Sequence, residues 1–359
     1  MKKHLLSLFF TIFLLQSSIS VCKAQWVTIP DTAFVTYLQI TFPSCMNGNL
    51  MDTTCPAIVN ATSVYCSHGN ISDLTGIQYF DNLQTLNCSS NQLSSLPPLP
   101  NSLTYLDCSG NDFISLPVLP DSLTTLICLG NGLSALPALP NSLTYLDCSL
   151  NLLISLPVLP NSLTYLNCSW NVYINLPVLP NSLTYLDCSE NELSSLPSLP
   201  NSLIDLECYE NLLDSLPALP NSLMILNCYL SQLTRLPALP NSLTNLTCWG
   251  NALTSLPALP NSLTYLDCSK NELSTLPALP NGLTYLDCSE NELSTLPALP
   301  NGLTYLGCFV NELSTLPALP NGLTYLECSY NQISNISALP PVLGSCFINN
   351  NPISCLPQL

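Results

Sequence analysis

The sequence predicts a solenoid in which short coils stack on one another. Short parallel β-strands would line its concave face, extended, polyproline-like segments its convex side, and a small cap its N-terminal end. Three observations predict this fold. A twenty-residue unit, LTYLDCSxNxLSxLPxLPNS, begins at Leu83 and is present in fourteen copies, the last of them truncated. Apolar and polar residues alternate in the first part of the unit, as they do in a strand. Prolines three residues apart fill the second part, which is too short and too rich in proline for a helix.

On this basis the chain divides into four parts. Residues 1–24 have the features of a signal peptide, and residues 25–60 are expected to form an N-terminal cap. Residues 61–82 fit as a first repeat of 22 residues, and residues 83–359 hold the fourteen twenty-residue repeats. A single repeat cannot bury its apolar face alone, so the copies must stack to share a continuous core.

Each unit is expected to begin with a short strand, which in the copy LTYLDCSEN covers Thr184–Cys188. Side chains alternate between the two faces of a strand. Leu186 and Cys188 should therefore point into the core, whereas Tyr185 and Asp187 should face outward. The same parity applies to every other copy of the unit.

The remainder of the unit is expected to turn and to return along the convex back. An asparagine such as Asn191 follows the strand in thirteen of the fourteen units, and Ser231 is the exception. A buried asparagine amide can both donate to and accept from backbone groups that a turn leaves unpaired. In the LPxLP segment, proline fixes φ and disfavours a helix in the preceding residue, which predicts an extended path opposite the sheet.

The unit matches L-x-x-L-x-L-x-x-N-x-L with cysteine in the third leucine position, and the chain is identified as a member of the leucine-rich repeat family. The LPxLP form resembles the short bacterial class, which secreted effectors of enteric pathogens also contain. LTGIQYFDNLQTL resembles an internalin-type repeat, and WVTIPDTAFVTYL resembles the start of secreted Bacteroidetes proteins. The resemblance implies a secreted or surface interaction protein. Some effector relatives carry a ubiquitin-ligase domain after the repeats, which has no counterpart in this sequence.

Residues 1–24 have the pattern of a secretory signal peptide. MKKH supplies the basic start, LLSLFFTIFLL the apolar stretch and Ala24 a small residue, which predicts cleavage before Gln25. A lipid anchor on Cys22 is the weaker alternative, because Val21 is a poor residue before such a cut. The protein is therefore expected to be secreted or held at the cell surface.

Removal of the signal peptide would make the chain strongly acidic. It keeps 22 acidic residues and only two basic ones, Arg235 and Lys270, for a net charge of −20. Such a chain repels nucleic acid and anionic lipid. A cationic or a neutral partner is favoured. After residue 21 no apolar run approaches the roughly 18 residues that a membrane-spanning helix needs.

The N-terminal cap is expected to cover the open end of the solenoid. In IPDTAFVTYLQI, Pro30 and Asp31 mark the start of a helix. Phe34 and Leu38 would then face the core.

Four cysteines of the mature chain lie outside the regular repeat. Cys45 and Cys55 enclose a turn and are expected to form a disulfide in an oxidising compartment. Cys346 and Cys355 lie in the truncated last unit, which ends at LPQL. Either these two cysteines bridge and close the last coil, or the sequence is a fragment of a larger multidomain secreted protein. The fragment is favoured, because an exposed final coil invites aggregation.

Fourteen further cysteines form a ladder that runs from Cys66 and Cys88 to Cys328, with a period of twenty residues after the second. An evenly spaced column does not converge on a metal ion, and buried thiols without cationic neighbours are not activated. Disulfides between adjacent rungs are the rival interpretation. In-register Cβ atoms about 4.8 Å apart are further than a relaxed bridge prefers. The ladder is therefore expected to be reduced and to fill the core.

The sequence predicts no enzyme, no cofactor and no metal site. His68 is the single histidine of the mature chain, and no motif near it supports a catalytic triad. Neither a phosphate-binding loop nor an H-E-x-x-H motif is present. A calcium site at NGNLMD is disfavoured, because Asp52 is its one carboxylate.

The outward strand positions form three columns on the concave face. The first is mostly tyrosine, as at Tyr185 and Tyr265, and the second is mostly acidic, as at Asp187 and Asp267. The third is mostly serine, as at Ser189. Tyrosines beside acids could hold a cationic protein or a sugar. Alternatively, the tyrosines stack only to stabilise the sheet.

Residues 203–262 depart from this pattern, because their third column is aromatic on three consecutive strands. Exposed aromatic residues with flanking acids have the composition of a binding hot spot. The alternative is drift in a few units. The predicted ligand-binding residues are Tyr209, Tyr229, Trp249, Asp205, Glu207 and Asn227, together with Tyr185, Asp187, Tyr265 and Asp267.

These observations favour an exported scaffold for protein recognition or adhesion through a concave tyrosine and aspartate face. A carbohydrate-binding module is the second hypothesis, and a truncated multidomain protein is the third. The partner's identity, the oligomeric state and the redox state of the ladder do not follow from the sequence.

Overall fold

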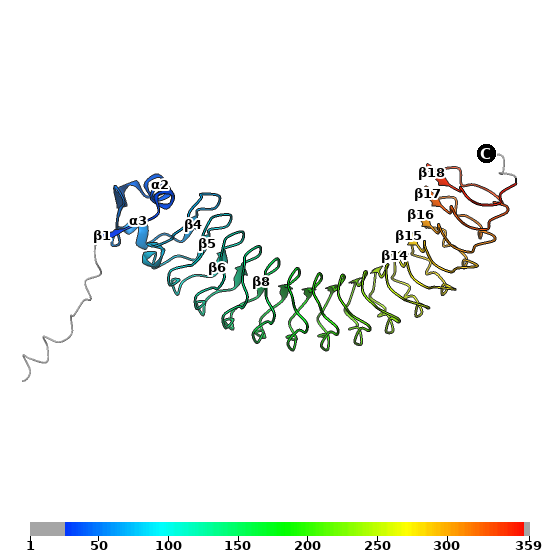
Figure 1. Ribbon diagram of the computed structural model, residues 1–359, viewed down its shortest axis with the longest axis horizontal. Coiled ribbons are helices and arrows are strands. Elements are labelled where there is room, and N and C mark those ends of the chain that lie inside the picture. The colour runs from blue at the N-terminus through cyan, green and yellow to red at the C-terminus, as the bar shows by residue number, and fades with distance from the viewer. Residues whose placement is uncertain (1–25, 355–359) are drawn as a thin grey trace, which may run out of the picture.

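The computed structural model describes residues 26–354, which form an open arc of stacked coils (Figure 1). The N-terminal cap lies at one end of the arc and strand β18 at the other. The strands of the long sheet follow the inner side of the arc, as is clearest from β14 to β18 (Figure 1). The predicted signal peptide and Cys355 lie outside the described residues.

The cap combines a small antiparallel sheet, of strand order β1-β3-β2, with short helices. Its elements are β1 (Trp26–Thr28), α2 (Thr32–Thr41), the 3₁₀ helix η1 (Pro43–Cys45), β2 (Met46–Asn47), β3 (Leu50–Asp52) and α3 (Pro56–Val59).

Helix α2 closes the end of the core. It begins after Asp31, whose Oδ1 accepts a hydrogen bond of 2.8 Å from the backbone N–H of Phe34. This is a side-chain N-cap, which satisfies an amide that the first helical turn leaves free. Phe34 and Leu38 are fully buried, as the sequence predicts. A disulfide joins Cys45 to Cys55, with 5.6 Å between the Cα atoms.

The solenoid is built on a parallel sheet of fifteen strands, which follow one another in chain order from β4 to β18. The 3₁₀ helix η2 (Ile77–Tyr79) lies on the return path of the first coil. The strands are β4 (Ser63–Tyr65), β5 (Thr85–Asn87), β6 (Tyr105–Asp107), β7 (Thr125–Ile127), β8 (Tyr145–Asp147), β9 (Tyr165–Asn167), β10 (Tyr185–Asp187), β11 (Asp205–Glu207), β12 (Ile225–Asn227), β13 (Asn245–Thr247), β14 (Tyr265–Asp267), β15 (Tyr285–Asp287), β16 (Tyr305–Gly307), β17 (Tyr325–Glu327) and β18 (Ser345–Phe347).

Neighbouring strands pair residue by residue at equivalent repeat positions. Leu186 of β10 lies opposite Leu166 of β9 and Leu206 of β11. Equivalent side chains therefore form straight columns along the solenoid. Because one face of the sheet must be buried, this register keeps every central leucine in the core.

The cysteine ladder lies inside that core. Each of the fourteen ladder cysteines, from Cys66 to Cys328, is buried and is a free thiol. Free cysteine behaves as a small apolar side chain, which suits the narrow space behind the end of each strand. Cys346 is also a free thiol, but it is exposed.

A second column, of asparagines, holds each coil to the one before it. The amide nitrogen of Asn191 donates to the carbonyls of Cys168, Cys188 and Ser189 at 2.9–3.2 Å. Its carbonyl oxygen accepts from the N–H of Tyr173 at 3.1 Å. The amide thus satisfies backbone groups of two coils, as its position in the sequence predicts.

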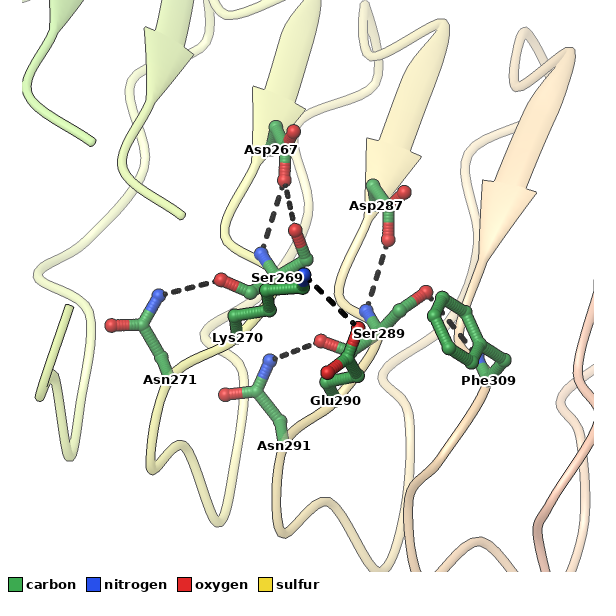
Figure 2. Close-up of polar contacts among 9 residues, drawn as sticks. All are labelled: Asp267, Ser269, Lys270, Asn271, Asp287, Ser289, Glu290, Asn291 and Phe309. Atoms are coloured by element: carbon green, nitrogen blue, oxygen red, sulfur yellow. Dashed lines mark hydrogen bonds and ion pairs between the residues drawn. The ribbon is translucent and has the colours of Figure 1, made fainter. Parts of the chain in front are cut away.

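The serines of the third column, which were expected to face outward, are held against the acids of the second column. Ser189 is fully buried. Its N–H and its hydroxyl both donate to Asp187 Oδ1, at 3.0 and 2.6 Å. The hydroxyl of Ser189 therefore lies beside the outward carboxylate of Asp187, although strand β10 ends at Asp187. Figure 2 shows the same arrangement at Asp267 with Ser269.

A hydrogen-bonded serine column also runs along the convex side. The hydroxyl of Ser182 donates to the carbonyl oxygen of Leu163, one coil earlier, at 2.6 Å. This contact recurs up to Ser262, whose hydroxyl donates to Leu243. Glycine then occupies the position in three successive units, at Gly282, Gly302 and Gly322.

Serine at the glycine positions should stabilise the C-terminal coils. A Cβ atom at Gly302 or Gly322 would meet no atom within 4 Å. We expect Gly302→Ser to raise the free energy of unfolding by about 1 kcal/mol, from one added hydrogen bond and a less flexible unfolded chain. Denaturant titration measures this. Gly302→Ala is the matched control, because it adds Cβ without the hydroxyl. If the two variants are equally stable, the added bond does not form.

No helix within residues 26–354 has the length and apolar character to cross a membrane.

Candidate functional site

Three stacks of aromatic rings lie on the concave face. In the first stack, Tyr145, Tyr165 and Tyr185 have ring centroids 4.1 and 4.4 Å apart. The last stack runs from Tyr265 to Tyr325, with neighbouring centroids 4.2–4.5 Å apart. Both occupy the first column, because in-register strands place equivalent rings face to face. Stacked rings stabilise the sheet, so this part of the face has a structural role.

The middle stack occupies a different column. The rings of Tyr209 and Tyr229 are 4.3 Å apart, and those of Tyr229 and Trp249 are 5.0 Å apart. These residues replace buried serines of the third column. All three are partly exposed.

Where the middle stack lies, the tyrosine column is interrupted. Strands β11, β12 and β13 carry Asp205, Ile225 and Asn245 at the first-column position. The gap lies between Tyr185 of β10 and Tyr265 of β14. On these three consecutive strands the first column of the concave face therefore carries no aromatic ring.

The acids beside this gap differ from those of the regular coils. Asp187 and Asp267 each accept two hydrogen bonds from a serine of their own coil. At Glu207 the serine is replaced by Tyr209, and Glu207 Oε1 instead accepts from the amide of Asn227 at 2.7 Å.

Asp205 and Glu207 form a carboxyl pair on β11. The Oδ1 atom of Asp205 is buried and has no hydrogen-bond partner. Burial raises the pKa of Glu207 to about 7, with Asp205 and Asp187 adding repulsion of its charged form. Burial also raises the pKa of Asp205. The nearby Asp205 side chain thus favours the protonated form of Glu207.

The chain places one cation on this face. Lys270 Nζ lies 5.8 Å from the ring centroid of Trp249, which is within reach of a cation–π contact. It lies 3.6 Å from Glu290 Oε1 (Figure 2). Both charged side chains are well exposed, so the ion pair contributes little to stability. Trp249, Lys270 and Glu290 nevertheless bring an aromatic ring, a cation and a carboxylate together.

The structure brings the predicted patch residues Tyr209, Tyr229 and Trp249 together and places Asp205, Glu207 and Asn227 beside them. Tyr185 belongs to the first stack and Tyr265 to the last, and Asp187 and Asp267 lie on the strands of these tyrosines. Sequence reasoning missed Lys270, which is a single substitution at a position that usually holds glutamate or a small residue.

Sequence reasoning also missed an apolar patch at the rim of the sheet. Two neighbouring coils there expose large apolar side chains at three positions where the next coil, residues 183–202, carries Glu190, Glu192 and Ser194. The departure from the repeat was the available signal. The patch consists of Leu150, Leu152, Ile154, Trp170, Val172 and Ile174.

Within the described residues, no group of three or more histidine, cysteine, aspartate or glutamate side chains could hold a metal ion. The ladder thiols are held neutral, since burial raises the pKa of each of them, for example to about 12 at Cys228. The surface therefore offers contacts for binding: partly exposed aromatic rings, the carboxyl pair of Asp205 and Glu207, and acids held by a serine of their own coil.

Comparison with known proteins extends this description. A family model described as Leucine Rich repeats (2 copies) matches residues 81–121. No curated protein matches the chain. YopM, described as a leucine-rich effector protein from Yersinia pestis, is 36% identical, with a TM-score of 0.77, and the match covers 85% of this chain and 88% of that one. YopM from Yersinia enterocolitica is also 36% identical, with a TM-score of 0.72 and coverage of 83% and 75%.

A third solved structure is also described as having a column of cysteines. The functional domain of InlJ from Listeria monocytogenes, which is described as including a cysteine ladder, is 25% identical. Its TM-score is 0.60, and the match covers 93% of this chain and 73% of that one.

Proposed function

The chain belongs to the leucine-rich repeat family, and we propose that it is an exported recognition protein that binds a protein partner on its concave face. The observation that carries this proposal is the middle stack. The regular coils stack tyrosine in the first column, whereas residues 203–262 move the aromatic rings to the third column and open a gap beside them. This departure from the repeat gathers partly exposed aromatic and acidic side chains in one patch, which is the composition of a hot spot.

The chemistry of the patch supports a positively charged partner. The mature chain would carry a net charge of −20 (22 acidic and two basic residues), which steers cationic proteins towards it. A carbohydrate is the second candidate, because tyrosine rings and carboxylates also suit a sugar. An exported protein of the bacterial cell surface or surroundings is the setting that the N-terminal residues favour. The leucine-rich repeat scaffold generally binds proteins and does not catalyse reactions.

A photo-crosslinking experiment tests the proposed face. A crosslinking amino acid at Asn245 lies in the gap of the concave face, and one at Val178 lies on the exposed convex side. We expect a discrete crosslinked protein from Asn245 and not from Val178. Equal crosslinking from both positions would refute the concave site. Binding of the wild-type chain to a glycan array, without a crosslinked protein, would favour the carbohydrate function.

Truncation of the middle stack should then abolish binding of the crosslinked partner. Trp249→Ala removes the largest ring of the stack and exposes one face of Tyr229. Hot-spot aromatics contribute about 2 kcal/mol or more, so we expect at least roughly a thirtyfold loss of affinity, measured by calorimetry. Tyr305→Ala, which truncates the last stack, is the matched control and should leave the affinity within about threefold. Equal losses in the two variants would show that ring stacking serves only the fold.

A further inference from the structure

The first aromatic stack ends at Tyr185 with a ring face that no other ring covers. Tyr165 stacks on one face of Tyr185 at 4.4 Å, with the ring planes 2° apart. The next residue in the column is Asp205, which pairs in register with Tyr185. The opposite face of the ring therefore looks towards β11, where the column holds a carboxyl group in place of a ring.

Two further carboxyl groups lie at this junction between β10 and β11. Asp187 follows Tyr185 on β10, and Glu207 follows Asp205 on β11. Asp187, Asp205 and Glu207 all add electrostatic repulsion to ionised Tyr185, which places the three carboxyl groups near its ring. Asp187 is bound by its own serine, whereas Asp205 Oδ1 accepts no hydrogen bond.

The basic residues of the described chain do not neutralise this junction. Arg235 and Lys270 are the two basic residues between positions 26 and 354. Lys270 contacts Trp249 and Glu290, and Arg235 lines a shallow hollow on the convex side with Ser215 and Leu216. Three carboxyl groups therefore share one small area without a counter-charge.

At the end of the middle stack, by contrast, the chain itself covers the last ring face with a cation. There the stack ends at Trp249, and Lys270 lies over the ring while pairing with the carboxylate of Glu290. An aromatic face, a cation and a carboxylate are all present. At Tyr185 the aromatic face and the carboxylates are present, but the cation must come from another molecule.

We propose that the junction between β10 and β11 seats a lysine or arginine side chain of the protein partner, held against the ring face of Tyr185 by Asp205 and Glu207. This inference rests on the proposed function, since it names the group that the concave face would take from its partner. A buried carboxylate oxygen without a donor is satisfied by an ammonium or guanidinium group, which donates several hydrogen bonds. A neutral sugar hydroxyl would leave the repulsion between the carboxylates in place.

Binding should be coupled to the protonation of Glu207. The groups that face it are Tyr185 and Asp187 on β10, Asp205 on its own strand, and Asn227 on β12, with Tyr229 beyond. Because the pKa of Glu207 is about 7, the unoccupied pair carries a proton at pH 6 and loses it by pH 8. A cation favours the ionised pair, so affinity should rise with pH by about tenfold between pH 6 and pH 8, as one-proton linkage requires.

Fluorescein-labelled hexa-arginine is a suitable probe, with fluorescence anisotropy as the readout. An acidic protein binds such a peptide weakly at many places, so the pH dependence and the variants carry the test. We expect the wild-type chain to bind about tenfold more tightly at pH 8 than at pH 6. Glu207→Gln should weaken binding at pH 8 and remove the pH dependence.

Asp205→Tyr is the second variant, and it is chosen because the substitution should not disturb the fold. It installs the residue that eight other units carry at this position, so it should extend the first stack and cover the face of Tyr185. We expect the pH-dependent binding to disappear. Asp121→Asn is the matched control: it removes one charge away from the sheet and installs the residue of most other units, and it should bind like the wild type.

Retention of pH-dependent binding in Asp205→Tyr, or the same affinity at both pH values in the wild type, would overturn the inference. A neutral glycan that binds the wild-type chain but not Asp205→Tyr would overturn it in favour of a sugar. These results are separate from the crosslinking test. A partner that still requires Trp249 but ignores Asp205 would leave the proposed function standing and remove only the cation seat.

Discussion

Replacing Asn191 by leucine should lower the free energy of unfolding by about 4 kcal/mol, because it leaves several buried backbone groups without partners. The amide nitrogen donates to three carbonyls, of Cys168, Cys188 and Ser189, and the amide oxygen accepts from the N–H of Tyr173. Leucine has a similar volume but can satisfy none of these groups. Each unsatisfied buried group costs about 1–3 kcal/mol, and partial relaxation of the turn recovers some of the total.

The reverse substitution, which introduces the asparagine, can be made at Ser231. Of the fourteen twenty-residue units, this is the one without the asparagine, and Ser231 Oγ is buried without a hydrogen-bond partner. Ser231→Asn should therefore stabilise the chain by about 1–2 kcal/mol. Urea denaturation followed by circular dichroism measures both variants. A stabilised Asn191→Leu, or a destabilised Ser231→Asn, would show that the asparagine column does not hold the coils together.

Much of the fold could be predicted because each coil repeats the same sequence pattern and therefore the same local structure. The position of Leu186 and Cys188 in the core follows from alternation that starts in the strand and continues one residue past its end, and fourteen copies repeat the same pattern. The role of Asn191 follows from the backbone groups that any such turn leaves free. The helix that starts after Asp31 could be predicted from its capping residue alone.

The burial of Ser189 could not be predicted from alternation alone. Alternation indicates a side of the sheet, but it does not reveal that the serine donates two hydrogen bonds to the carboxylate of Asp187. This also changes the meaning of the acidic column. Most of its members hold a serine of their own coil, so Asp187 and Asp267 have a structural role that the sequence did not indicate.

The composition of the candidate site could be predicted, but its geometry could not. Tyr209, Tyr229 and Trp249 stand out as departures from the repeat. Which ring faces are covered depends on side-chain conformations and on the neighbouring coil. The contact of Lys270 with Trp249 and the unsatisfied oxygen of Asp205 therefore required the structure.

Alkaline solution should unfold the chain within a narrow range above pH 9. The fourteen ladder thiols are buried, and burial raises their pKa values, to about 12 at Cys148 and Cys228. The thiols of an unfolded chain have an ordinary pKa of about 9.0. Below pH 9 both states hold the same thiol protons, so this contribution to stability is fully present. Above it the unfolded chain releases protons that the folded chain retains, and stability is lost as the pH rises.

The expected effect is large because the thiols act together. Each buried thiol lowers the free energy of unfolding by about 1.4 kcal/mol for each pH unit above 9. Fourteen of them sum to roughly 20 kcal/mol at pH 10, which exceeds the 5–15 kcal/mol stability of a typical domain. The tyrosine columns act in the same direction at higher pH, since burial also raises the pKa of Tyr185 and Tyr285.

Circular dichroism and thiolate absorbance near 240 nm, recorded together from pH 8 to 11 with a reductant present, test this expectation. The two signals should change in a single steep transition, because a thiol can ionise only after its coil opens. Replacing Cys168, Cys188 and Cys208 together by alanine should make the transition less steep, since three protons fewer are released. Thiolate absorbance that grows gradually while the dichroism stays constant would mean that solvent reaches the ladder in the folded chain. In that case burial would not explain why these thiols stay neutral and unreactive, and packing could no longer account for the column.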